Sequence, residues 1–219
     1  MGKRAPTNNK VRMGVIGAGR IGSLHAKHLA TRVPGVELLA ISDIRRKEAE
    51  RCAAAYDIPE VHRDAAPLLD DPEIDAVCIC SSTDTHADLI TETAEAGKHI
   101  FCEKPIDLQL ERIDQALTAV ERAGVKLMVG FNRRFDHNFR RVHDAVQNGA
   151  IGTPHLLHIV SRDPSPPPPA YIEVSGGIFL DMTIHDFDIA RYLVDSEVEE
   201  LHVMGGVLVD AGAAGVVRP

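Results

Sequence analysis

The feature that most constrains this chain is a glycine-rich segment near its start, where Gly17, Gly19 and Gly22 follow a short apolar run. The apolar run predicts a β-strand, and the helical spacing of apolar residues after it predicts a helix. A G-x-G-x-x-G turn between a strand and a helix is typical of a pyrophosphate cradle, with the helix N-terminus facing the anion. We expect contacts with a dinucleotide at Gly17, Gly19, Arg20, Ile21 and Gly22.

An acidic residue follows the second apolar run, residues 36–41, which ends in Ser42 and Asp43. A carboxylate at the tip of the second strand is placed to accept hydrogen bonds from an adenosine ribose. It would also repel the 2′-phosphate of NADP, so Asp43 predicts NAD as the cofactor. Arg45 and Arg46 lie close enough to favour NADP instead. A structural turn followed by a solvated aspartate is the plainer interpretation of the same residues.

Strands and helices alternate over residues 11–132, which predicts an α/β fold with a doubly wound parallel sheet. The strands are near-continuous apolar runs, as expected when helices cover both faces of a sheet. The predicted strands are 12–16, 36–41, 76–80, 99–102 and 126–131. The predicted helices are 21–31, 46–56, 85–96 and 109–123.

The pattern changes after Gly130, and residues 133–219 are expected to form a second domain. Residues 155–160 predict a strand, and residues 198–209 predict one or two more. Between them, the prolines at 164 and 166–169 exclude a central strand or a helix. This proline run is therefore expected to be a rigid surface loop or a linker.

Composition excludes several classes of protein. The chain has 219 residues and a net charge of −8 without a basic stripe, which argues against nucleic-acid binding. No apolar stretch approaches the ~20 residues that span a bilayer. Residues 1–10 are polar and lack an apolar core, so they predict a disordered lead-in and not a signal peptide. Four cysteines without zinc or disulfide spacing predict buried thiols in a reducing, cytoplasmic setting; they are Cys52, Cys78, Cys80 and Cys102.

Ligands of doubly wound sheets bind outside the carboxyl ends of the strands, so the residues there are candidates. Lys104 follows a predicted strand, where it can reach the nicotinamide or the substrate, and partial burial would fit it for proton chemistry. A surface Glu–Lys pair beside a turn explains Glu103 and Lys104 equally well. Pro105 fixes the backbone that follows and is a candidate for a cis peptide. Further cofactor contacts are predicted at Ser81, Thr83, His86 and Glu103.

A second constellation lies at 181–188, where Asp181, His185 and Asp188 are related by four and seven positions and would share one face of a helix. Histidine titrates near neutrality and can accept a proton, and an acid one turn away can orient it. A solvated helix face is the plainer alternative. A metal site, and with it a metal-dependent hydrolase, is weaker because no second histidine completes the set.

Polar residues that follow later strands are candidates for holding substrate hydroxyls. Asn132 and Arg133 come directly after the predicted strand at 126–131, and Asp163 follows the strand at 155–160. Arginine and asparagine bind hydroxyls or phosphates well. For the neighbouring Arg134, a salt-bridged loop is the interpretation we favour.

Six segments together resemble the Gfo/Idh/MocA oxidoreductases: GVIGAGRIGSLHAKHL, SD at 42–43, EKP at 103–105, GFNRRFD at 130–136, SRDP at 161–164 and SGGIFLDMTIHDFDIARYL at 175–193. The resemblance implies a Rossmann domain followed by a second domain with an open, mainly antiparallel sheet, through which dimers or tetramers form. It implies a catalytic group of Lys104, Asp181 and His185. It also implies contacts of substrate hydroxyls with Asn132, Arg133, Asp163, Asp181 and Asp188.

The expected activity is NAD-dependent oxidation of a secondary hydroxyl of inositol or a related cyclic polyol. Members of the family extend further than this chain, so we expect an incomplete second domain with an open sheet edge. Two other functions stay open. One is a dinucleotide-binding protein without catalysis, and the other is a dehydrogenase of the same family that acts on an aldose such as glucose.

Overall fold

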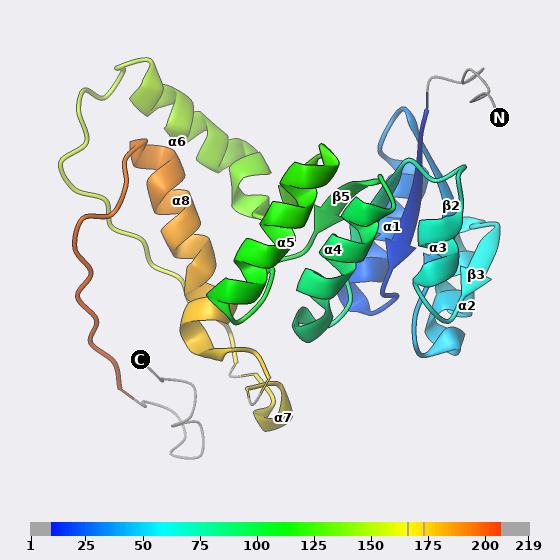
Figure 1. Ribbon diagram of the computed structural model, residues 1–219. Coiled ribbons are helices and arrows are strands. Elements are labelled where there is room, and N and C mark those ends of the chain that lie inside the picture. Colours follow the sequence, from blue (N-terminus) through cyan, green and yellow to red (C-terminus); the bar gives the residue numbers. More distant parts are fainter. Residues whose placement is uncertain (1–9, 166, 173, 207–219) are drawn as a thin grey trace. The chain divides into compact units, whose positions relative to one another are not determined.

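The computed structural model describes residues 10–165, 167–172 and 174–206 of the chain. The chain divides into two compact units, Met1–Gly130 and Phe131–Pro219. In Figure 1 the elements of the first unit run from blue to green, and those of the second run from yellow-green to orange.

The first unit is built on a six-stranded sheet in which all neighbouring strands are parallel. The strand order is β3-β2-β1-β4-β5-β6, so the chain changes direction across the sheet between β1 and β4. The strands are β1 (Val11–Ile16), β2 (Val36–Ser42), β3 (Glu60–His62), β4 (Ala76–Ile79), β5 (His99–Cys102) and β6 (Leu127–Val129). This architecture confirms the predicted doubly wound α/β fold.

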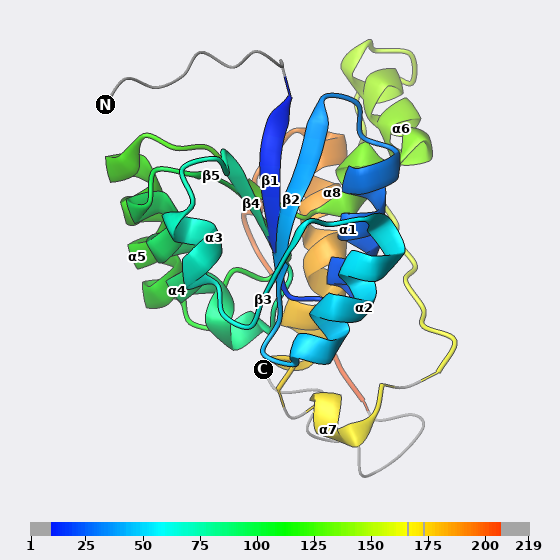
Figure 2. The ribbon, with the colours of Figure 1, turned by 90° about the vertical axis from the view of Figure 1, so that its right-hand side faces the viewer.

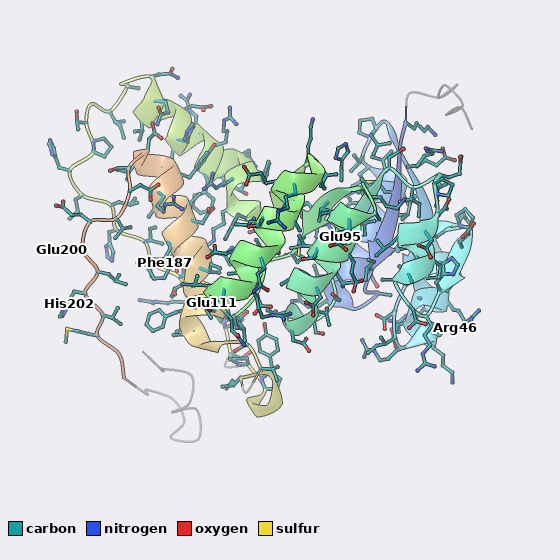
Figure 3. All side chains as sticks on the ribbon, in the orientation of Figure 1. Arg46, Glu95, Glu111, Phe187, Glu200 and His202 are labelled. Atoms are coloured by element: carbon teal, nitrogen blue, oxygen red, sulfur yellow. The ribbon has the colours of Figure 1, made fainter. Side chains whose placement is uncertain are left out.

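Helices cover both faces of this sheet, with α1 and α2 on one side and α3, α4 and α5 on the other (Figure 2). Their bounds are α1 (Arg20–Thr31), α2 (Arg46–Tyr56), α3 (Ala66–Asp70), α4 (His86–Glu95) and α5 (Leu110–Ala123), with a short 3₁₀ turn η1 (Thr83–Thr85) before α4. Charged side chains such as Arg46, Glu95 and Glu111 are exposed on these helices (Figure 3).

Two apolar layers follow from the alternation of side chains along each strand. Val77 and Ile79 of β4 pack in one layer with residues of α4 and α5, whereas Cys78 between them packs in the other layer with residues of α1 and α2. Each fully buried aliphatic side chain contributes about 1.5–3 kcal/mol. Because both faces are buried, the strands had to be continuous apolar runs, and this made them easy to predict.

The four cysteines behave as small core residues, as predicted. All four carry free thiols; Cys52, Cys78 and Cys102 are buried and Cys80 is half-buried. Burial raises the pKa of the Cys52 and Cys102 thiols. Raised pKa values leave little thiolate, so these groups are inert at neutral pH.

Two short elements of the first unit, β3 and α3, were not predicted. They span three and five residues, which is too short for a pattern of period 2 or 3.6 to stand out. β3 forms because its backbone pairs with β2, from Ala40 to Ser42. In the part of the chain that the structure describes, no helix has the length and apolar character needed to cross a membrane.

The second unit, as far as it is described, contains helices and irregular segments. The helices are η2 (Asn132–Phe135), α6 (His137–Gln147), α7 (Pro169–Ile172), the π-helix η3 (Phe179–Thr183) and α8 (Ile184–Val194). α6 packs against α8. The Asp136 side chain caps α6 by accepting hydrogen bonds from the backbone N–H groups of Asn138 and Phe139.

The strands predicted in this unit are wrong for the described residues. Residues 155–160 and 198–206 have no partner strand there, and Leu156 is 88% exposed. Residues 207–209 lie outside the described part. A strand needs a neighbour for its backbone hydrogen bonds, and an apolar sequence alone does not supply one. The expected sheet is therefore absent from the second unit as described.

The proline run was also only partly predicted. Residues 164, 165, 167 and 168 form no regular element, but α7 begins at Pro169. Proline is tolerated at the first position of a helix because its missing N–H is not needed there. Pro166 lies outside the described residues.

Candidate active site

The glycine-rich turn joins β1 to α1 and is shaped by two of its three glycines. Gly17 has φ +95°, and a Cβ there would lie 2.6 Å from the carbonyl carbon of Cys80. A Cβ on Gly22 would lie 1.8 Å from the carbonyl oxygen of Gly17. Side chains at these positions are therefore excluded by the fold itself.

Gly19 differs from the other two, because a Cβ there would meet no atom of the described structure within 4 Å. Its lack of a side chain leaves open space beside the backbone at the start of α1. No side chain caps this helix in the described structure, and its first turn contains no acid. The first N–H groups of a helix have no acceptor within the helix and can bind an anion. Cofactor contacts of Arg20 and Ile21 stay predictions.

Asp43, which directly follows β2, is tied to the same turn. Its Oδ2 accepts a hydrogen bond of 2.7 Å from the backbone N–H of Ala18, and its Oδ1 accepts one of 2.8 Å from Arg45. Asp43 is 9% exposed. A carboxylate has about four acceptor positions, so two remain for hydroxyl groups of a ribose. The residues thus fit a dinucleotide whose phosphates lie at the turn.

The segment after β4 holds three further candidates. The Ser81 and Thr85 hydroxyls are 2.7 Å apart, and Thr83, which is half-buried, begins the turn η1. His86 is almost fully buried, and its ring nitrogens face the carbonyl oxygens of Pro105 and Ser81. Because both nitrogens already have protein neighbours, this geometry favours an indirect role for His86. Cofactor contacts of Ser81 and Thr83 stay predictions.

The Glu103-Lys104-Pro105 turn follows β5, and its Lys104–Pro105 peptide is cis. Glu103 Oε1 lies 2.7 Å from Nε2 of His25, a residue of α1. Burial acts to raise the pKa of Glu103. The hydrogen bond and charge of His25, and the backbone N–H and charge of Lys104, act in the opposite direction and are stronger. The pKa of Glu103 is therefore below its usual range. Glu103 therefore anchors the turn as a carboxylate.

The catalytic residues predicted in the second unit lie around η3 and α8. Asp181 is in the π-helix and accepts a 2.8 Å hydrogen bond from the Tyr171 hydroxyl, while His185 is in the first turn of α8. The His185 ring is edge-on to Phe131, with centroids 6.4 Å apart. The expectation of one regular helix is wrong here, because the π-helix changes the spacing between Asp181 and His185. Such segments occur frequently at functional sites.

Aspartates of α8 pair with arginines of η2. Asp188 is buried and is bound by Arg134 through three contacts of 2.7–3.1 Å, which confirms the salt bridge expected for Arg134. Asp186 accepts hydrogen bonds from Arg133 and from the Ser161 hydroxyl. A substrate hydroxyl that binds Asp188 or Arg133 would have to do so while each side chain keeps its ion pair. Both substrate contacts stay predictions.

Asn132 and Asp163 are both exposed, in η2 and in the irregular segment before α7. Their contacts with substrate hydroxyls stay predictions, as does the convergence of Lys104 with Asp181 and His185. Among the described residues, no group of three or more His, Cys, Asp or Glu side chains is arranged to hold a metal ion.

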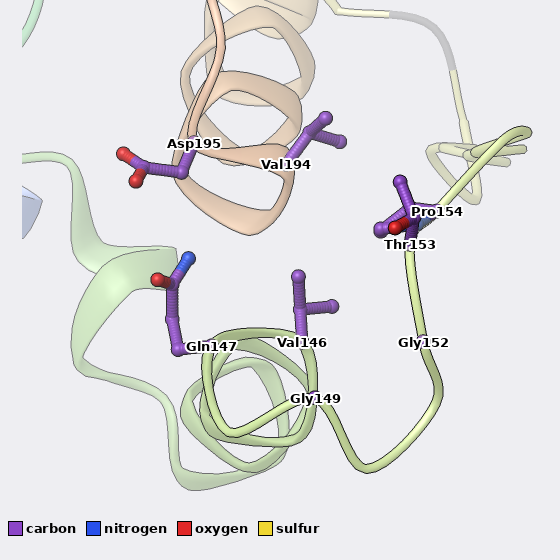
Figure 4. A pocket seen from close by; sticks show the side chains of 8 residues that line it. All are labelled: Val146, Gln147, Gly149, Gly152, Thr153, Pro154, Val194 and Asp195. Carbon is purple, nitrogen blue, oxygen red and sulfur yellow. The ribbon is translucent and has the colours of Figure 1, made fainter.

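An open pocket lies between the ends of α6 and α8 (Figure 4). Its lining includes a single ionisable side chain, Asp195, so it lacks the groups needed for acid–base chemistry.

Three residues with clear roles were missed by the sequence analysis: His25, Tyr171 and Asp186. His25 lies three positions after Gly22, on the stripe of α1 that faces the sheet. A polar residue on such a stripe is a signal that could have identified it. Tyr171 and Asp186 have no comparable signal, because their partners are set by tertiary packing.

The parallel sheet and the glycine-rich turn define a dinucleotide-binding domain of the Rossmann class. Residues 11–131 match the model of the oxidoreductase family with an NAD-binding Rossmann fold, and residues 139–217 match the C-terminal domain model of the same family. The chain belongs to the Gfo/Idh/MocA family.

Similar proteins are known by sequence and by structure. The chain is 51% identical over 209 residues to myo-inositol 2-dehydrogenase of Thermotoga maritima, covering 94% of this chain and 62% of that protein. It resembles the crystal structure of a putative myo-inositol dehydrogenase from Sinorhizobium meliloti, with a TM-score of 0.91 and 48% identity over 94% of this chain and 62% of that one. For scyllo-inositol dehydrogenase from Lactobacillus casei with bound NAD(H) and scyllo-inositol, the TM-score is 0.76 and the identity 33%, over 85% of this chain and 56% of that one. The chain thus spans about three fifths of the length of these relatives.

Proposed function

We propose that the protein catalyses NAD-dependent oxidation of a secondary hydroxyl of myo-inositol, or of a related cyclic polyol, to the ketone. The observation that carries the proposal is the hydrogen bond from Ala18 N–H to Asp43, because it ties the acid that we propose to bind the ribose to the turn that we propose to bind the phosphates. The names of the relatives supply the substrate class. When bound, NAD supplies the hydride acceptor, and the protein supplies placement and proton transfer.

The residues of the proposed active site divide the proton chemistry between them. His185 takes the proton of the substrate hydroxyl as general base. Lys104 donates a hydrogen bond to the same oxygen and stabilises its developing negative charge. Asp181, itself held by Tyr171, orients the pair. The other hydroxyls of the ring are held by four polar residues: Asn132, Arg133, Asp163 and Asp188. Arg133 and Asp188 bind hydroxyls while they keep the ion pairs described above.

A panel of polyols and sugars, followed by NADH absorbance, tests the proposal. We expect turnover with myo-inositol or scyllo-inositol. His185→Ala should lower kcat by about 10²–10⁴-fold with NAD affinity retained, because a general base contributes about that much. The matched control is His202→Ala, which replaces an exposed histidine of the same unit. NAD binding without turnover of any compound would indicate a non-catalytic binding protein, and turnover of glucose alone would indicate an aldose dehydrogenase.

Cofactor choice is tested separately at Asp43. We expect the protein to prefer NAD over NADP and Asp43→Ala to weaken that preference, because the carboxylate repels a 2′-phosphate. Arg45, whose Nε is 3.7 Å from Asp43, would then be free to bind the phosphate. Titration of both cofactors measures the ratio, with the exposed Asp64→Ala variant as control. An unchanged ratio in Asp43→Ala would show that Asp43 does not contact the ribose.

The setting of the protein belongs to the same proposal. Four free thiols fit a reducing compartment, and we place the protein in the cytoplasm with a small polyol and NAD as its ligands. Assembly into dimers or tetramers, as the family resemblance implies, is measured by light scattering of the purified chain. A monomer at all concentrations would argue against that assembly.

A further inference from the structure

Two histidines from different helices contact the Glu103-Lys104-Pro105 turn on either side of Lys104. His25 of α1 places its Nε2 2.7 Å from Oε1 of Glu103. His86, the first residue of α4, places its Nδ1 2.8 Å from the carbonyl oxygen of Pro105. All of these residues belong to the first unit, so the arrangement is internal to one compact body.

The contact between His25 and Glu103 is partly buried, with the two side chains 28% and 22% exposed. The His25 ring packs against Phe101, with centroids 5.0 Å apart. Gly130 lies next to the same carboxylate, because a Cβ at this position would be 3.0 Å from Oε2 of Glu103. The backbone N–H of Lys104 also hydrogen-bonds to this carboxylate. The Glu103 carboxylate is therefore held by His25 and by the backbone of Lys104, and the space beside Gly130 leaves no room for another side chain.

His86 connects the turn to a different loop. Its Nε2 lies 3.1 Å from the carbonyl oxygen of Ser81, and the side chain is 2% exposed. A carbonyl only accepts hydrogen bonds, so the ring must donate, to one of the two oxygens when neutral and to both when protonated. In either state the His86 ring lies between the carbonyl oxygen of Ser81, in the segment after β4, and that of Pro105, in the turn after β5.

We propose that His25 and His86 are positioning residues that hold Lys104 in place relative to the two cofactor loops. His25 links the turn to α1, which begins at the glycine-rich segment, and His86 links it to the segment that contains Ser81. The inference rests on the proposed function, in which Lys104 hydrogen-bonds to the substrate oxygen. A displacement of about 1 Å in a reacting group can lower a rate by about 10²-fold.

The kinetic test for His25 compares three variants. His25→Ala should lower kcat for myo-inositol by about 10- to 100-fold while KM and NAD affinity change little, because the turn moves but the binding residues remain. His25→Gln keeps an N–H donor and should recover a large part of kcat. His28→Ala, one turn along the same helix, is the matched control and should behave like the unmodified protein. Equal kcat values for His25→Ala and His28→Ala, or no recovery with Gln, would overturn the proposal for His25.

The corresponding test for His86 uses a substitution that preserves volume in the core. His86→Gln should lower kcat with little change in melting temperature or KM, because one amide cannot reach both carbonyl oxygens. A kcat equal to that of the unmodified protein would remove His86 from the proposal. A melting temperature that falls in step with kcat would assign His86 to the stability of the unit and contradict a positioning role.

A measurement without turnover separates this inference from the proposed function. Acetylation of Lys104, measured by mass spectrometry relative to the exposed Lys27, reports the surroundings of the lysine directly. We expect the ratio to change in His25→Ala and not in His28→Ala. A changed ratio in a protein that oxidises no polyol would uphold the positioning role and refute the proposed function. An unchanged ratio in a protein that does oxidise polyols would refute the positioning role and uphold the proposed function.

Discussion

The two units of this protein are stabilised in different ways. In the first, two apolar layers enclose a sheet, with fully buried residues such as Ile41, Ile79 and Ile90. In the second, the buried apolar side chains among the described residues are Ile189 and Leu193. There η2 and α8 are joined by two ion pairs and by the Arg134 guanidinium, which lies over the Tyr192 ring. The Tyr192 ring also stacks on His143, with centroids 4.1 Å apart.

This difference shows how each unit positions its functional residues. Apolar burial is non-directional, so the first unit uses it to hold strands whose ends present the glycine-rich turn and Asp43. Bidentate arginine–carboxylate pairs fix direction as well as distance. The second unit uses the pair of Arg134 with Asp188 to hold α8, the helix that carries His185. Apolar packing therefore holds the strands of the first unit in place, and a few directed contacts then fix the turns at their ends. In the second unit, directed polar contacts hold the helix itself.

The largest expected effect is the loss of a core side chain in the first unit. Ile90→Ala should lower the free energy of unfolding by about 2–5 kcal/mol, because it leaves a cavity in a fully packed layer. Ile189→Ala should have a smaller effect, since fewer buried apolar neighbours surround it among the described residues. Urea unfolding followed by circular dichroism measures both, because the chain has no tryptophan. An equal or larger effect at Ile189 would show that the second unit also depends on an apolar core.

A smaller and more local effect is expected from the ion pair in the second unit. Arg134→Gln removes the bidentate partner of the buried Asp188, and should weaken the protection of α8 by about 1–3 kcal/mol. Hydrogen exchange of the α8 amides measures this, and the amides of the first unit should be unaffected. Arg140→Gln is the control, because its pair with Asp144 is exposed on both sides and should change little. Equal protection of α8 in both variants would contradict a structural role for the pair.

The smallest expected effect is a pH dependence of stability in the first unit. It tests whether the directed contact between His25 and Glu103 stabilises that unit. The pKa of Glu103 lies below its usual range, so its contribution to stability is present above the unfolded value of about 4.3 and is lost as pH falls through the lower folded value. The difference in melting temperature between the unmodified protein and Glu103→Gln should therefore shrink as the solution is acidified below about pH 4. Glu95→Gln, an exposed change, should give no such trend. A difference that stays constant with pH would show that the charge of Glu103 does not stabilise the fold.

The accuracy of the sequence predictions follows the same division. The bounds of β5 and α2 were predicted to the residue, because a strand buried on both faces and an amphipathic helix leave clear patterns. The strand expected at 155–160 is wrong because a strand requires a paired neighbour, which a short apolar sequence does not provide by itself. The regular helix expected from Asp181 to His185 failed because no rule of spacing signals a π-helix.

The sequence by itself determined the glycine-rich turn, the acid after the second strand and the parallel sheet, because each depends on steric limits and periodicity within a few neighbouring residues. The tertiary structure decided which polar groups meet. His25 pairs with a residue 78 positions away, and Arg134 with one 54 positions away. Such pairs form only when the packing of whole elements brings their side chains within about 3 Å, and local sequence does not encode that distance.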